Sequence, residues 1–524
     1  MSAYSFTRAA FVAAFCLSAT QVFAEDNSQG RWVAGDLHVH TALSADARTH
    51  LDDAVHKAFD DFNLDYMATS NHLRNNSGNN QHDKSISQLF SKSLRDYEWP
   101  ALQQLAESYP DKLLMSTFEW DMPAHDHFNI GLLTGNNTDK KLPATAYFEY
   151  RFGAKNADDD FSSAQLDAFR KQQVPRQNQT HEDGVAALKW LQENYAGSGF
   201  AMLNHPTRYA SSYRMEDIRE FNDVAPDVFF LVEGMVGNQF NGYRGDYDNQ
   251  SHAGLWGGSD PFAAEVGGNW DALLAEGRRL WLVTNSDHHF KAIPPYSSGY
   301  FPGEYSKTYV YLQNEPLNQA NWLTAMRSGN SFSVFGDIIN GMDFSLVAET
   351  GAKASMGQTL VAKAGETITL NLTLTQPAHT NREKVVGNEV YDGEVPPLHH
   401  VDLIAGEMVE KTKPGTREYA ASGNPSTHIL KTFTDEDWTV NADGSYSMSF
   451  RLKADKNTYY RLRGTTLGTE QSGFTKNGEP VRSALIDRGE TFSPDYYETI
   501  NQRNYTDCWF FSNPVFLRVD ETAG

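Results

Sequence analysis

The fold is decided by the stretch Gly35-Asp36-Leu37-His38-Val39-His40-Thr41, where two histidines end a short apolar run that begins at Trp32. Residues i and i+2 of a β-strand point to the same face, so a strand through His38 and His40 directs both imidazoles towards one point. Paired imidazoles of this kind suit a divalent metal ion. The motif alone is weak, because two histidines on one strand also occur as a buried hydrogen-bonded pair.

Four further apolar runs end at the same kinds of side chain. They are residues 64–70 before Asn71-His72, 113–118 before Glu119, 199–203 before Asn204-His205, and 280–284 before Asp287 and His289. Such runs are typical of parallel strands covered on both faces, and helix-like stretches alternate with them at 52–62, 101–109, 183–195 and 269–277. Repeated strand–helix units predict an α/β barrel whose functional site lies at the strand ends. Any one of these side chains is more often a helix cap, but five such endings favour a shared site.

The order of these motifs resembles the PHP (polymerase and histidinol phosphatase) superfamily of metallohydrolases. The matching residues are His38-x-His40, Asp46, His72, Glu119, His205-Pro206 and Asp287-His288-His289. Residues 270–279 and 325–332 are most similar to its secreted or carbaryl-hydrolase-like branch. The resemblance covers roughly residues 31–340. It implies a distorted (β/α)7 barrel that holds two or three divalent metal ions.

The resemblance also implies a ligand set. The metal ligands would be His38, His40, Asp46, His72, Glu119, His127, His205, Asp287 and His289. Glu119 and Asp287 are the expected catalytic carboxylates. Arg208, three residues past His205, is added as a catalytic residue because guanidinium pairs well with phosphate oxygens. His127 is preferred to His125 because an apolar strand-like run follows it directly.

Two positions depart from the family pattern. Asn71 stands where an Asp is usual, which we expect to alter the orientation of neighbouring side chains more than the number of metal ions. His288 replaces a small residue, and we expect it to point away from Asp287 and His289 as a packed or solvent-facing side chain.

The mixture of ligand types indicates the chemistry. Imidazoles with a few carboxylates suit Zn²⁺, Mn²⁺ or Fe²⁺, whereas oxygen ligands alone would suit Mg²⁺ or Ca²⁺. Two such ions can activate a bridging water for hydrolysis. The sequence contains no Gly-x-Ser-x-Gly motif, and Cys508 has no flanking signal of a nucleophile. Metal-activated hydrolysis is therefore the predicted reaction class.

The ends and composition of the chain predict its organisation. Residues 1–24 have the pattern of a signal peptide, whose apolar part is too short to span a bilayer, so we expect a bacterial periplasmic or secreted protein without a membrane span. A metallohydrolase barrel is predicted at 25–340. Alternating strand-like segments such as 366–374 and 446–452 then predict a β-sandwich-like domain at 341–524. The oligomeric state is not indicated.

Charge bears on the partner. The chain has 67 acidic and 44 basic residues, a balance that repels phosphodiester backbones, so we expect a small-molecule substrate and no nucleic acid. Long inserts at 74–91 and 136–180 are expected to shape the pocket. Arg208 and Lys307 are the cations expected near a bound anion.

The sequence is consistent with three functions. The first is hydrolysis of a phosphoester of a small molecule, which the superfamily and Arg208 favour. The second is hydrolysis of a carboxylic ester, amide or carbamate, which the carbaryl-hydrolase-like segments favour. The third is a non-catalytic metal-binding protein, which we expect least because every expected ligand type is present.

Overall fold

The computed structural model describes residues 30–81, 83, 85–209, 212–237, 244, 247, 254–289, 301–383, 390–393, 395–483, 499–500 and 503–520. The predicted signal peptide at residues 1–24 lies outside the described residues. None of the described helices is long and apolar enough to cross a membrane.

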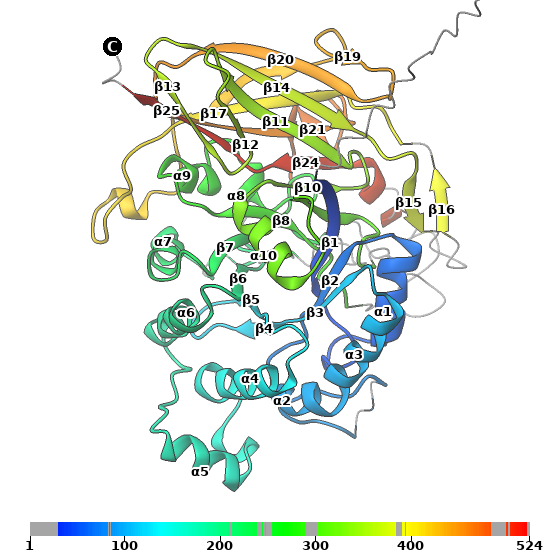
Figure 1. Ribbon diagram of the computed structural model, residues 1–524, viewed down its shortest axis with the longest axis vertical. Coiled ribbons are helices and arrows are strands. Elements are labelled where there is room, and N and C mark those ends of the chain that lie inside the picture. Colours follow the sequence, from blue (N-terminus) through cyan, green and yellow to red (C-terminus); the bar gives the residue numbers. More distant parts are fainter. Residues whose placement is uncertain are drawn as a thin grey trace, which may run out of the picture.

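The N-terminal part mixes strands and helices, which confirms the predicted α/β class (Figure 1). One group of strands pairs in the order β10 (Ser331–Phe335), β9 (Ser306–Leu312), β1 (Arg31–Val39), β2 (Tyr66–Thr69) and β3 (Leu113–Ser116). A second sheet has the order β4 (Phe118–Asp121), β5 (His127–Leu132), β6 (Gly199–Leu203), β7 (Phe229–Met235) and β8 (Trp281–Thr284). The five apolar runs that carry the predicted ligands therefore do form strands.

Helices lie around these sheets (Figure 1). The predicted helical stretches correspond to α1 (Leu51–His56) with a π-helical continuation (Lys57–Asp61), α3 (Trp99–Ser108), α6 (His181–Tyr195) and α9 (Asn269–Ala275). The others are α2 (Phe90–Ser93), α4 (Thr138–Phe152), α5 (Ser163–Lys171), α7 (Met215–Val224), α8 (Pro261–Ala264) and α10 (Gln319–Ser328). A capping box between Thr180 and Asp183 starts α6, because each satisfies a backbone N–H of the other. Leu188 and Leu191 of α6 then pack in the same core as Phe200 of β6.

Among the described residues, the strands do not close into the distorted (β/α)7 barrel that the resemblance implies. β5 runs antiparallel to both β4 and β6, because a short turn and not a helix joins β4 to β5. Among the described residues, isolated parallel bridges of Val39 with His288 and of His72 with Glu119 join the two sheets in place of ladders. The polar strand ends thus lie where regular pairing stops, so the candidate site forms at the seam between the sheets.

The C-terminal part has two packed β layers. One is an antiparallel sheet of β12 (Lys353–Ser355), β11 (Gly341–Ala348), β14 (Thr367–Thr375), β20 (Tyr446–Lys453) and β19 (Thr439–Val440). The other contains β13 (Thr359–Lys363), β25 (Val515–Asp520), β21 (Thr458–Thr465), β24 (Trp509–Ser512), β17 (His400–Glu407) and β18 (His428–Phe433). Phe344 and Leu370 from the first layer share a buried cluster with Leu403 and Leu462 from the second. Alternate residues of the strands supply this core, as period-2 patterning requires.

One sheet crosses the predicted boundary near residue 340. β10 pairs antiparallel with β24. A single sheet therefore runs in the spatial order β13-β25-β21-β24-β10-β9-β1-β2-β3. A buried ion pair adds a second connection, since two nitrogens of the Arg461 guanidinium on β21 each lie 2.7 Å from a carboxylate oxygen of Asp271 on α9. Both side chains are fully buried, and a buried charge is stable only when paired in this way.

Candidate metal centre

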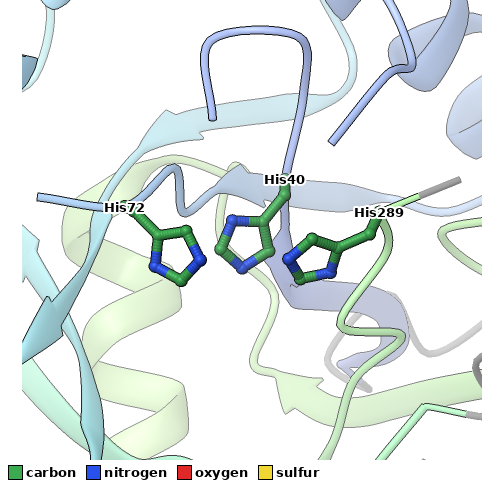
Figure 2. A group of neighbouring side chains, drawn as sticks. All are labelled: His40, His72 and His289. Carbon is green, nitrogen blue, oxygen red and sulfur yellow. The ribbon is translucent and has the colours of Figure 1, made fainter. Parts of the chain in front are cut away.

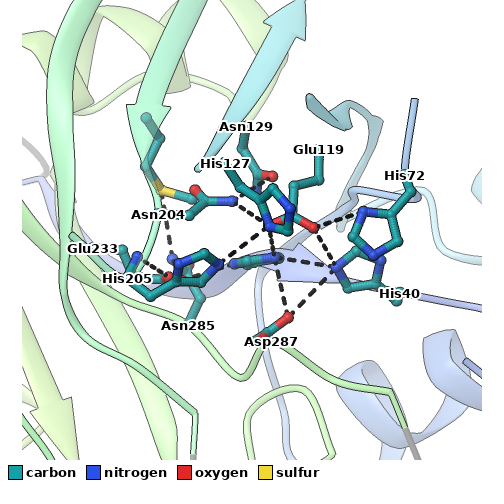
Figure 3. Close-up of polar contacts among 12 residues, drawn as sticks. His40, His72, Glu119, His127, Asn129, Asn204, His205, Glu233, Asn285 and Asp287 are labelled. Carbon is teal, nitrogen blue, oxygen red and sulfur yellow. Dashed lines mark hydrogen bonds and ion pairs between the residues drawn. The ribbon is translucent and has the colours of Figure 1, made fainter. Parts of the chain in front are cut away.

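Glu119 lies at the centre of a cluster of histidines (Figure 3). Its carboxylate oxygens face one ring nitrogen of each of five imidazoles: His38 at 3.1 Å, His40 at 3.3 Å, His72 at 2.9 Å, His127 at 2.9 Å and His205 at 3.4 Å. The Glu119 side chain is buried on β4, next to the bridge with His72. A buried carboxylate surrounded by imidazoles is stabilised by positive charge between them, from protons or from metal ions.

Asp287 closes the cluster from the opposite side (Figure 3). Its Oδ1 lies 3.1 Å from His38 Nε2, 3.4 Å from His40 Nε2 and 3.3 Å from His289 Nδ1. His38 and His40 therefore lie between two carboxylates. The backbone of Asp287 is left-handed, at φ 47°, and so is that of His205, at φ 29°. Such strain in non-glycine residues is found mainly where a function fixes the geometry.

His40, His72 and His289 lie side by side (Figure 2). The ring centroids are 4.0 Å apart for His40 and His289, and 4.5 Å apart for His40 and His72. Asp46 Oδ2 approaches the Nε2 atoms of His72 at 3.2 Å and of His289 at 3.7 Å. The Asp46 side chain is 43% exposed, whereas those of His38 and His40 are 0% exposed, so the cluster opens towards solvent at Asp46. The structure thus brings all nine predicted ligands together.

The other residues weighed in the sequence lie elsewhere. His125 contacts the carbonyl oxygen of Ser212 and the ring of His181, outside this cluster. His288 is buried, with its Nε2 2.7 Å from Thr49 Oγ1, so it is a packed side chain as expected. Lys307 forms a buried ion pair with Asp337.

Sequence reasoning missed Glu233, which fixes two of the histidines. Its Oε1 accepts a hydrogen bond from His38 Nδ1 at 3.0 Å and one from Asn285 Nδ2 at 2.9 Å, and its Oε2 accepts from the backbone N–H of His205 at 3.0 Å. A carboxylate on Nδ1 fixes the tautomer that leaves Nε2 available to a metal ion. In the sequence, the apolar run 228–232 leads directly into Glu233 within β7, so the pattern of an apolar run followed by a ligand would also have found it.

Two further missed carboxylates, Asp121 and Asp126, lie around His127. They are 3.4 and 3.6 Å from His127 Nε2, and Asp126 is also 3.5 Å from His205 Nδ1. Arg208 donates to Asp126 Oδ1 at 2.9 Å, and its Nη2 lies 3.4 Å from His127 Nδ1. Neither carboxylate follows an apolar run in the way that identified the ligands, so the pattern could not find them.

Asn71 occupies a buried network beside the cluster. Its side-chain oxygen accepts from the N–H of Thr41 at 2.8 Å and from Ser44 Oγ at 3.0 Å, and its amide donates to Glu98 at 2.9 Å. Ser44 Oγ in turn lies 3.1 Å from His40 Nδ1. The Asn71 side chain therefore contacts groups that orient the imidazoles, and its backbone oxygen accepts a hydrogen bond from the N–H of Glu119 at 3.1 Å.

The charges of the cluster reinforce one another. Burial lowers the pKa of His38, but the carboxylates of Asp287, Glu233 and Glu119 raise it well above its usual range. Burial and Arg208 lower the pKa of His205, yet Asp126 and Glu119 raise it to about 9. Burial raises the pKa of Glu119, but the surrounding imidazoles hold it well below its usual range. The cluster thus attracts protons, which a bound cation would displace.

The donor set fits divalent transition metals. Four groups of three side chains each place their ligand atoms within 4.8 Å of one another: His40/His72/His289, His38/His40/Glu119, His72/Asp121/His127 and Glu119/His127/His205. Both ring nitrogens of His205 are buried and make no hydrogen bond within the described structure. They instead face carboxylates at longer distances, Glu119 at 3.4 Å and Asp126 at 3.5 Å, so both nitrogens remain available as ligand atoms. Nitrogen and carboxylate donors together match Zn²⁺, Mn²⁺ or Fe²⁺.

Known proteins add little to the assignment of this site. No protein-family model and no curated protein matches the sequence. Among solved structures, the chain is similar to a two-domain protein from Bacteroides vulgatus that contains a predicted PHP-like metal-dependent phosphoesterase. The match covers 88% of this chain and 96% of that chain, with 12% identity and a TM-score of 0.35. A similarity of this size does not establish a common fold, and the superfamily remains a prediction from the motifs.

Proposed function

We propose that the protein is a metal-dependent hydrolase of the PHP type that acts on a phosphoester of a small molecule. The proposal depends on one observation above all. Nine candidate ligands, from segments up to about 250 residues apart in sequence, form one cluster, in which six histidines contact Glu119 or Asp287. Nine ligands exceed what one ion of four to six coordination positions requires, so we expect two or three ions.

The residues that would hold the ions are the nine ligands, among which Glu119 contacts five histidines and Asp287 contacts three. When bound, the ions supply Lewis-acid polarisation of the substrate and a water acidic enough to ionise near neutral pH. Glu233 holds His38 and the backbone of His205 in place. Asp126 holds Arg208 in place. The Arg208 guanidinium can pair with anionic oxygens of a phosphoester that the metal ions do not contact.

The test uses purified protein reconstituted with Mn²⁺, Zn²⁺ or Fe²⁺. We expect at least two equivalents of metal by elemental analysis, and turnover of phosphomonoesters or cyclic phosphoesters in a panel that also contains aryl esters and carbamates. Glu119→Gln provides the inactive control. Turnover of aryl esters or carbamates alone would replace the phosphoesterase assignment with the ester, amide or carbamate hydrolase. Metal loading without turnover of any substrate would support a non-catalytic metal-binding protein.

We also propose export to the bacterial periplasm or beyond. The support is the sequence pattern of residues 1–24, with Arg8, an apolar stretch and small residues before Glu25. N-terminal sequencing of the protein produced in a bacterium should find Glu25 at the start. A mature chain that begins at Met1 would contradict this.

A further inference from the structure

His127 lies between two guanidinium groups, and one of them has no role in the function proposed so far. Arg74 Nη2 donates to His127 Nε2 at 3.2 Å. Arg208 Nη2 lies 3.4 Å from the other ring nitrogen of His127, Nδ1. The two arginines come from different segments, Arg74 two residues after His72 and Arg208 three residues after His205. They therefore meet at two edges of one candidate ligand.

Each guanidinium is held by its own carboxylate. Arg74 makes a two-point contact with Asp121, from Nε at 2.7 Å and from Nη2 at 2.8 Å. Arg208 donates to Asp126 at 2.9 Å. Charge-assisted contacts of this kind fix the plane of the guanidinium, so less side-chain entropy is lost when it binds a further anion.

Both guanidiniums retain unused donors. Within the described part of the chain, the Nη1 group of neither Arg74 nor Arg208 donates a hydrogen bond, and Nε of Arg208 is buried without a partner. Guanidinium has five N–H donors and no acceptor, so these groups are available to hydrogen-bond to water or to a bound anion.

The arginines lie on the solvent side of the cluster. The side chains of Arg74 and Arg208 are 23% and 13% exposed, whereas that of His38 is fully buried. A substrate that reaches the histidines at this edge therefore meets the two arginines beside its reacting group.

We propose that Arg74 and Arg208 form a subsite for the terminal phosphate of a phosphomonoester. This inference rests on the proposed hydrolase and narrows its substrate class. A monoester carries close to two negative charges at neutral pH and three non-bridging oxygens, enough to meet two guanidiniums and the metal side at once. A diester carries one charge and two non-bridging oxygens, so it has less charge and one fewer oxygen to share among the two guanidiniums and the metal side.

Anion binding tests the subsite independently of turnover. Inorganic phosphate, methyl phosphate and dimethyl phosphate are titrated by calorimetry into the metal-loaded full-length protein. We expect the first two to bind and dimethyl phosphate to bind at least about 10-fold more weakly. Arg74→Met should weaken phosphate binding by about 10-fold or more, and Arg74→Lys by a smaller factor, because lysine keeps the charge but not the fork. The metal content of both variants should equal that of the wild type.

Arg95→Met is the matched control. Arg95 makes the same two-point contact with Asp96, at 2.7 and 3.0 Å, and contacts none of the described histidines. Wild-type phosphate affinity in a folded, metal-loaded Arg74→Met protein would overturn the subsite, as would equal affinities for methyl and dimethyl phosphate. Phosphate binding that depends on Arg74, without hydrolysis of any phosphoester, would instead refute the proposed function and leave the subsite standing.

Discussion

Replacing Glu233 by Gln should weaken metal binding without removing a metal ligand. Glu233 accepts three hydrogen bonds, from His38, Asn285 and the backbone of His205, and is fully buried. Gln has one acceptor oxygen, so at best it keeps the two bonds at Oε1 and turns its NH₂ group towards the N–H of His205. The variant thus loses one hydrogen bond and the charge that supports His38.

The expected magnitude follows from this geometry. Removing the partner of a metal-bound histidine typically costs 10- to 100-fold in metal affinity, which is about 1.4–2.8 kcal/mol. Competition of the purified protein with a chromophoric chelator for Zn²⁺ measures the change directly, and circular dichroism checks the fold.

Glu98→Gln is the matched control for this experiment. Glu98 is equally buried and also accepts three hydrogen bonds, from Thr69, Asn71 and Ser116, but it contacts no histidine. We expect similar losses of stability in the two variants and a much larger loss of metal affinity at Glu233, because Glu98 reaches the histidines only through Asn71 and Ser44. Unchanged Zn²⁺ affinity in a folded Glu233→Gln protein, or an equal loss in Glu98→Gln, would refute the reasoning.

Four other substitutions test the centre and its surroundings. Glu119→Gln or Asp287→Asn should abolish turnover with an unchanged circular dichroism spectrum, since each removes shared anionic charge at constant size; a near-normal kcat would move the active site elsewhere. Arg208→Ala should cost on the order of 10²-fold in kcat/KM for a phosphoester, about 3 kcal/mol, but less than about 10-fold for a neutral ester, and a retained phosphoesterase rate would exclude its role. Burial raises the pKa of Glu149 to about 7, although hydrogen bonds from backbone N–H groups of α2 lower it. The folded protein therefore binds a proton that the unfolded chain releases above pH 4.5. Its free energy of unfolding should fall by on the order of 3 kcal/mol as pH rises from 4.5 to 7. Urea unfolding should show this fall in the wild type and not in Glu149→Gln, and parallel pH profiles would contradict it.

The sequence predicts which side chains gather at the candidate site better than it predicts the pairing of strands. An apolar run that ends in His or Glu marks both a strand and its chemistry, which is why residues as distant as His38 and Asp287 could be assigned together. The direction of a strand leaves no such mark. β5 is as apolar as its neighbours, and only the turn after Asp121 makes it antiparallel.

The sequence also could not predict contacts between single side chains that are distant in the chain. Asp121 and Asp126 lie beside His127 because of the turn between β4 and β5, and Arg74 reaches Asp121 across 47 residues of sequence. The pairing of β10 with β24 joins segments about 180 residues apart, and neither edge carries a pattern that specifies its partner.

The shared sheet means that the region after residue 340 is not a detachable module. A chain cut there would leave the backbone groups of β10 that pair with β24 without partners, and an uncovered strand edge is a template for aggregation. The same cut would leave the buried carboxylate of Asp271 without Arg461, inside the half that carries the histidines. Recombination that exchanges the C-terminal half between relatives would therefore have to preserve both the strand edge and the acid–base pair, and the two halves are expected to evolve as one unit.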